Sequence, residues 1–139
     1  MSIYRGLPGS GTDPTGYGAT RRQVARWRSN RTGTDPRLDI HLRPLDYSLG
    51  KPREKGIDVQ LALDLAFGAA NGEFDVVVLF SGDSDLLPAL ERASASGVAC
   101  ESASWRDGGR RLPKKPFLMW EHRLTELDYR HVDDPTDYR

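Results

Sequence analysis

The feature that most constrains the fold of this chain is an unbroken apolar run at residues 76–80, which ends in the turn-forming pair Ser81 and Gly82. Such a run is typical of a β-strand that is buried on both faces of a parallel sheet. A helical pattern follows at residues 86–91, and Pro88 is tolerated because it falls in the first helical turn. The segment therefore predicts a strand, a tight turn and a helix, the repeating unit of an open α/β sheet.

Two carboxylates, Asp83 and Asp85, lie in this turn, at the carboxyl end of the predicted strand. Open α/β sheets bind their ligands at this end of their strands. Two carboxylates held close together repel each other unless a positive charge lies between them, and a divalent metal ion is the simplest such charge. The alternative is purely structural, with Asp85 as the N-cap of the helix and Asp83 as a side chain that stabilises the turn at Gly82.

A third acid, Asp58, lies in the first turn of a strong predicted helix, Ile57–Ala70. Helical spacing puts Asp58 on the same face as Leu61 and Leu65, so we expect its carboxylate to point toward the protein. The helix dipole favours negative charge in the first turn, and Asp58 could also serve only to support the helix. Asp64 lies about 120° round the helix and is left out of the predicted site.

Other elements alternate along the chain. The sequence predicts strands at residues 3–7, 38–43 and 98–102, helices at 20–29 and 86–96, and a last helix or strand within 118–132. Strands that alternate with helices predict a three-layer α/β fold around a mostly parallel sheet. A chain of 139 residues fits a single domain, residues 1–139, with a core of its own.

Composition excludes little, because lysine plus arginine and aspartate plus glutamate both total 20. The basic residues nevertheless gather in two segments, at residues 21–31 and 106–115. The single cysteine, Cys100, cannot form an intramolecular disulfide and is expected to be a buried, inert thiol, which favours a reducing cytoplasm. No apolar run approaches the roughly 20 residues of a membrane span, so no membrane partner is expected.

Several motifs together closely resemble the NYN domain, a PIN-like (Rossmannoid) ribonuclease fold. They are RPLDY at residues 43–47, KGIDV at 55–59, FD at 74–75, SGDSDL at 81–86 and DPTDY at 134–138, and they span nearly the whole chain. The resemblance implies a domain that binds Mg²⁺ or Mn²⁺ through clustered aspartates and cleaves RNA. It implies that Asp58, Asp83 and Asp85 are the catalytic metal ligands and that Ser81 positions water or metal beside them.

The start of the chain departs from the NYN pattern. Such domains begin with a central apolar strand that ends in an aspartate, whereas residues 1–8 resemble the second strand of the family, and the first acid after them is Asp13. The missing strand should supply the middle of the sheet and one metal ligand. Without it we expect unpaired strand edges and exposed apolar surface. Either the true start lies upstream or the chain is an N-terminally truncated, impaired product; if residues 3–7 are already the first strand, Asp13 is the fourth candidate ligand.

Hydrolysis of a phosphodiester bond needs an activated water near pH 7 and positive charge near the phosphate oxygens, and metal ions held by carboxylates can supply both. Oxygen ligands suit Mg²⁺ or Mn²⁺ better than zinc. His41, His122 and His131 lack the spacing of a metal site and are interpreted as structural or exposed. Lys55, close to Asp58, is either a contact for substrate phosphate or a solvated loop lysine.

The residues predicted to bind RNA are Arg21, Arg22, Arg26, Arg110, Arg111, Lys114 and Lys115. Trp27, Trp105 and Tyr47 are candidate stacking surfaces for bases. Trp27 and Trp120 are, however, better interpreted as core residues. A solvated helix face is the alternative for the basic residues between 21 and 31.

Two other classes of protein remain open. One is a catalytically impaired RNA-binding or protein-interaction module of the same fold. The other is a different metal-dependent phosphotransfer enzyme, because Toprim-type domains also place D-x-D after a strand. Those domains need a glutamate after an earlier strand, and none precedes Asp83 in that setting. The phosphate-loop motif G-x-x-x-x-G-K-[S/T] is absent. Self-association of the chain is left open.

Overall fold

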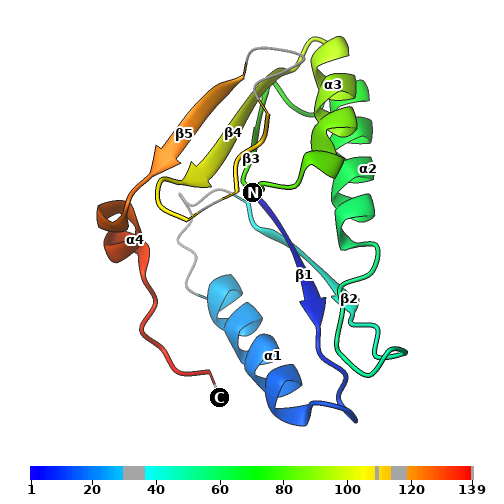
Figure 1. The fold of residues 1–139 in the computed structure, drawn as a ribbon, viewed down its shortest axis with the longest axis vertical. Coiled ribbons are helices and arrows are strands. Elements are labelled where there is room, and N and C mark those ends of the chain that lie inside the picture. The colour runs from blue at the N-terminus through cyan, green and yellow to red at the C-terminus, as the bar shows by residue number, and fades with distance from the viewer. Residues whose placement is uncertain (30–36, 109, 114–118, 139) are drawn as a thin grey trace. The chain divides into compact units, whose positions relative to one another are not determined.

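The computed structural model describes residues 1–29, 37–108, 110–113 and 119–138. The chain divides into two compact units: unit 1 comprises Met1–Val59 and Pro135–Arg139, and unit 2 comprises Gln60–Asp134. Each unit is built around its own sheet, and the strands of both sheets pair in parallel (Figure 1). The predicted α/β class with parallel strands is therefore confirmed, while the assignment of residues 1–139 to one domain stays a prediction.

Unit 1 contains a two-stranded sheet. Strand β1 (Ser2–Leu7) pairs with β2 (Asp39–Pro44) along its whole length, with Ser2 opposite Asp39 and Leu7 opposite Pro44. Parallel neighbours need a long crossover connection, and this one contains helix α1 (Pro14–Ser29). The sequence therefore predicted both strands to within one residue, and the helix between them but not where that helix begins.

Helix α1 begins earlier than predicted, at Pro14 rather than at residue 20. Asp13 Oδ1 accepts a hydrogen bond of 2.9 Å from the backbone N–H of Gly16, as the side chain of an N-cap does. Proline suits the first helical position because the N–H that it lacks would have no partner there. Asp13, the alternative fourth ligand, is thus engaged in starting this helix.

Unit 2 contains a three-stranded sheet in the order β3-β4-β5. The strands are β3 (Val76–Leu79), β4 (Ala99–Trp105) and β5 (Trp120–Leu124). Helix α2 (Ile57–Ala70), most of which belongs to this unit, precedes β3, while the short 3-10 helix η1 (Ser84–Leu86) and helix α3 (Leu87–Ala95) connect β3 to β4. Helix α4 (Glu126–Val132) follows β5, so the region predicted as one helix or strand holds both.

The core of unit 2 lies between one face of this sheet and helices α2 and α3. Its buried side chains include Leu65, Leu79, Leu90 and Val98. Leu90 is fully buried, which is consistent with its place in the middle of α3. Because the direction of side chains alternates along a strand, Leu79 faces this core while its neighbours in sequence face the other way.

The opposite face of the unit 2 sheet is open. Val76, Val78 and Phe80 are 51%, 53% and 55% exposed, so the expectation that residues 76–80 are buried on both faces is wrong for this face. Trp120, expected in the core, is 69% exposed. Among the described strands, β1, β2, β3 and β5 each pair on one side only. The expectation that the family's first strand is missing stays a prediction.

Candidate functional site

The predicted acidic turn, which is residues 81–85 with Asp83 and Asp85, lies at the carboxyl end of β3, in unit 2. The backbone N–H of Asp83 donates to Ser81 Oγ at 3.2 Å, and the backbone N–H of Asp85 donates to Asp83 Oδ1 at 3.0 Å. Asp83 is therefore the N-cap of η1. The structural alternative drawn from the sequence named Asp85 as the cap, and that assignment is wrong. Both acids are exposed.

The acidic turn packs against the backbone of Arg110. A Cβ atom built on Gly82 would lie 2.4 Å from Arg110 Cβ and 2.5 Å from the Arg110 carbonyl oxygen. Contacts this short are impossible for a real side chain, so only glycine permits the two segments to approach so closely. A predicted RNA-binding arginine and two predicted catalytic acids are thus neighbours within unit 2, which their spacing in the sequence does not signal.

Arg111, also predicted to bind RNA, forms an ion pair with Glu121 on β5. Its Nε donates to Glu121 Oε1 at 2.9 Å, and its Nη2 donates to Oε2. Ser104 Oγ donates to Glu121 Oε1 at 3.0 Å. Hydrogen bonding from Arg111, more than any other contact, lowers the pKa of the Glu121 carboxyl to about 2. Arg111 therefore binds the segment after β4 to strand β5. Its contact with RNA stays a prediction. Lys114 and Lys115 lie outside the described residues.

Asp58 lies in the first turn of α2, in the part of the helix that belongs to unit 1. It is exposed, whereas Ile57 before it and Leu65 two turns later are buried. The expectation that its carboxylate points into the protein is therefore wrong. Residues of the later turns, such as Leu65 and Ala69, make the core contacts of this helix.

Asp83 and Asp85 belong to unit 2 and Asp58 to unit 1, so the convergence of the three acids on one ion stays a prediction. Within the described ranges, no group of three or more His, Cys, Asp or Glu side chains is gathered for a metal ion. The chemistry of the predicted donor set nevertheless fits Mg²⁺ or Mn²⁺, because carboxylates and a serine hydroxyl supply only oxygen ligands. All three carboxylates are exposed, which leaves them accessible to a hydrated ion.

The side chains interpreted as structural have partners in the fold. His41 stacks on Tyr4 with 4.5 Å between ring centroids, and His122 Nε2 lies 2.6 Å from Glu101 Oε2. His131 Nδ1 lies 2.7 Å from the carbonyl oxygen of Leu127. Cys100 is partly buried rather than buried as expected, and this burial raises the pKa of its thiol, which favours the unreactive protonated form.

The remaining candidates lie in unit 1. Lys55 Nζ is 3.8 Å from Asp46 Oδ2, and the lysine is otherwise highly exposed. Tyr47 Oη accepts a hydrogen bond of 3.1 Å from the backbone N–H of Gly9, which gives this ring a structural role. Arg22 donates to the carbonyl oxygen of Tyr138 from Nε, at 2.9 Å, and from Nη2. The basic residues Arg21, Arg22 and Arg26 are all exposed on α1, as a surface for a polyanion requires.

Parallel strands, with aspartates in the turn that follows one of them, define a class of α/β domain that binds ligands at the carboxyl end of its sheet. The family model for the NYN domain matches residues 14–112, and the chain therefore belongs to the NYN family, which is PIN-like and generally ribonuclease-like. The matched region includes Asp58, Asp83 and Asp85. Neither the curated proteins nor the solved structures compared with the chain gave a match.

No helix within the described ranges combines the length and the apolar character that crossing a membrane requires.

Proposed function

We propose that this chain is a metal-dependent ribonuclease that hydrolyses phosphodiester bonds of RNA. The observation that carries the proposal is the turn after β3, which presents Asp83 and Asp85 at the carboxyl end of a parallel strand in a chain of the NYN family. Asp58, Asp83 and Asp85 would hold Mg²⁺ or Mn²⁺. When bound, the ion supplies a Lewis acid for the phosphate and an activated water.

The protein's own groups prepare this reaction. The cap formed by Asp83 Oδ1 fixes the acidic turn, and a carboxylate has a second oxygen with which to bind a cation. Ser81 Oγ accepts a hydrogen bond from Asp83, so its hydroxyl proton can be donated to water or to a phosphate oxygen. Arg110, held against Gly82, brings a positive charge for the RNA backbone. Arg21, Arg22 and Arg26 on α1, in unit 1, are further candidate contacts for RNA, and the single cysteine supports a cytoplasmic location.

Cleavage of a labelled single-stranded RNA tests this function. Wild-type protein should cleave with Mg²⁺ or Mn²⁺ and stop when EDTA is added, and Asp58→Asn or Asp83→Asn should lose most turnover while keeping the fold. Asp75→Asn is the matched control, because this exposed aspartate precedes the first residue of β3, at the opposite end of the strand. Cleavage that persists in both Asp58→Asn and Asp83→Asn, or that EDTA leaves unchanged, contradicts the proposal.

A catalytically impaired RNA-binding module of the same fold is the second candidate. The observation in its favour is the division of the described strands into two small sheets, in which β4 is the only described strand that pairs on both sides. RNA binding without cleavage, in the presence of Mn²⁺, is the outcome that would favour this candidate over the nuclease.

A further inference from the structure

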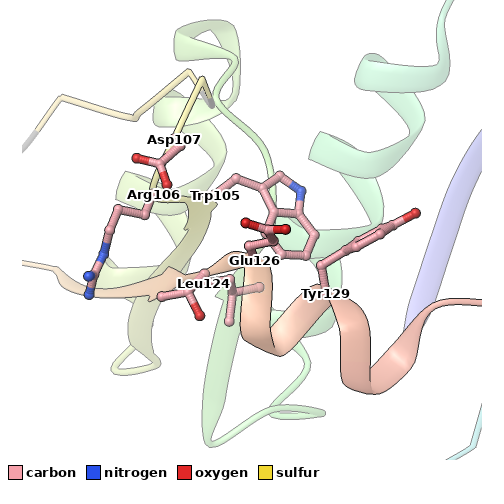
Figure 2. A pocket seen from close by; sticks show the side chains of 7 residues that line it. Trp105, Arg106, Asp107, Leu124, Glu126 and Tyr129 are labelled. Atoms are coloured by element: carbon pink, nitrogen blue, oxygen red, sulfur yellow. The ribbon is translucent and has the colours of Figure 1, made fainter.

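A pocket of about 290 Å³ lies at the carboxyl ends of β4 and β5, entirely within unit 2 (Figure 2). Trp105 from the end of β4, Leu124 from the end of β5 and Tyr129 from α4 line it together. The sequence named Trp105 as a candidate stacking surface but gave no sign of the other two residues. Leu124 lies opposite Trp105 in the β4–β5 register, so the ends of two paired strands form one side of the pocket.

The two aromatic residues form a corner suited to a flat ligand. Trp105 and Tyr129 meet edge to face, with ring centroids 5.9 Å apart and an angle of 76° between the ring planes. Figure 2 shows the two rings side by side, with Arg106 directed away from them. A hydrogen bond with Asp133 raises the pKa of Tyr129 above its ordinary value of 10. A planar ring can stack on one of these faces while its edge meets the other.

The charged groups of the lining offer a phosphate no net positive charge. Asp107 and Glu126 contribute two carboxylates, Arg106 contributes one cation, and Glu126 is paired with Arg130. The lining therefore lacks the excess of cations that a phosphate site needs. A nucleobase is neutral and carries N–H donors that carboxylates accept, and adenine, guanine and cytosine have an exocyclic amino group that uracil lacks.

The pocket is linked to the acidic turn through one aromatic contact. Phe80, which immediately precedes Ser81, packs edge to face on Trp105 with 5.6 Å between ring centroids. Strands β3 and β4 pair in parallel, with Leu79 opposite Ser102. The acidic turn after β3 and Trp105 at the end of β4 therefore lie toward the same edge of the sheet. A strand of RNA whose phosphate reaches the acidic turn therefore has a stacking surface close by.

We propose that the pocket formed by Trp105, Leu124 and Tyr129 binds one base of single-stranded RNA beside the phosphate presented to Asp83 and Asp85. The proposal deepens the proposed function and rests on it for the choice of RNA as the ligand. It assigns to the pocket a preference for bases that carry an amino group over uracil.

Binding of fluorescently labelled oligonucleotides, measured by anisotropy in EDTA, tests the pocket without catalysis. Trp105→Ala should weaken the binding of an oligoadenylate by about five- to 150-fold, since that is the range of stacking on one aromatic side chain. Trp105→Phe should restore most of the affinity. Trp120→Ala is the matched control, because Trp120 is exposed in the same unit but does not line the pocket, and it should bind as wild type does. Wild type should bind oligoadenylate more tightly than oligouridylate.

Three results overturn the pocket: wild-type affinity in Trp105→Ala, an equal loss in Trp120→Ala, or no measurable binding of RNA by the wild-type chain. If Trp105→Ala does not fold, as judged by circular dichroism, Tyr129→Ala replaces it, because Tyr129 is about half exposed and its loss opens no core. Binding that depends on Trp105 in a chain that does not cleave RNA keeps the pocket and rejects the nuclease. Metal-dependent cleavage whose rate is unchanged in Trp105→Ala and in Tyr129→Ala supports the nuclease and rejects the pocket.

Discussion

At the scale of single residues, Gly82 determines how closely Arg110 approaches the acidic turn. The position of a Cβ atom on Gly82 is already occupied by the backbone of Arg110. A flexible side chain could rotate away, but backbone cannot. A larger residue at position 82 must therefore shift either the turn that carries Asp83 or the segment that carries Arg110. Either shift increases the distance between Asp83, a predicted metal ligand, and Arg110, a predicted RNA contact.

Replacing Gly82 with alanine should lower the free energy of unfolding by about 1–3 kcal/mol, because an overpacked site forces its neighbours to move. The variant should also cleave RNA more slowly. Urea denaturation measures the first effect. Gly11→Ala is the control, since nothing lies within 4 Å of its Cβ position, and a surface change of this kind shifts the free energy by less than about 0.5 kcal/mol. Equal stability of Gly82→Ala and wild type would show that Arg110 does not approach Gly82.

At the scale of secondary-structure elements, the pair between Arg111 and Glu121 ties the segment after β4 to β5. The guanidinium contacts both carboxylate oxygens of Glu121, a geometry that is stronger than a single contact. Arg123 Nη1 lies 3.8 Å from the same carboxylate. Because Arg110 directly precedes Arg111, the ion pair between Arg111 and Glu121 also keeps Arg110 near the acidic turn.

The Glu121 pair should make stability depend on pH. The pKa of Glu121 falls from its ordinary 4.5 to about 2 in the folded chain. A carboxylate with a depressed folded pKa stabilises the fold above its unfolded pKa, and this contribution is lost as the pH falls toward the folded pKa. The Tm of Glu121→Gln should therefore lie below that of wild type at pH 7, and the difference should shrink from about pH 4.5 to about pH 2.

Thermal melts followed by circular dichroism across this pH range measure the difference. Glu126→Gln is the control, because Glu126 and its partner Arg130 are both highly exposed and such pairs contribute little. A Tm difference for Glu121→Gln that stays constant from pH 7 to about pH 2.5 would mean that Arg111 does not hold this carboxylate.

Much of the fold follows from local sequence patterns. Periodicity and turn-forming residues are local signals, because they depend only on neighbours in the sequence. They predict the strand in residues 76–80, the turn at Gly82 and the helix Ile57–Ala70. Burial is different, because it depends on what packs against each face. The exposure of Trp120 and Val78 illustrates this, since both were expected to be buried.

The same distinction applies to the site. Asp83 and Asp85 are recognisable because they share one turn with Gly82. The contacts between Phe80 and Trp105, and between Arg111 and Glu121, join residues that only the fold of unit 2 brings together. Sequence spacing alone could not reveal those contacts.

At the scale of the whole molecule, the central claim is that acids from two distant parts of the chain hold one ion. Asp58 lies in the first turn of α2, and Asp83 and Asp85 lie after β3. In the structure these acids belong to two units, each with a parallel sheet of its own. If the acids share an ion, the loss of any one of them removes a ligand from the same site.

Titration of Mn²⁺ by isothermal calorimetry tests this claim most directly. The loss of an outer hydrogen-bond partner in a metal site already weakens affinity by about 10–100-fold, so the loss of a ligand should weaken it at least as much. Asp58→Asn and Asp83→Asn should each reduce Mn²⁺ affinity by at least about tenfold, and Asp75→Asn should bind as wild type does. Wild-type Mn²⁺ affinity in Asp58→Asn, together with its loss in Asp83→Asn, would contradict a shared site.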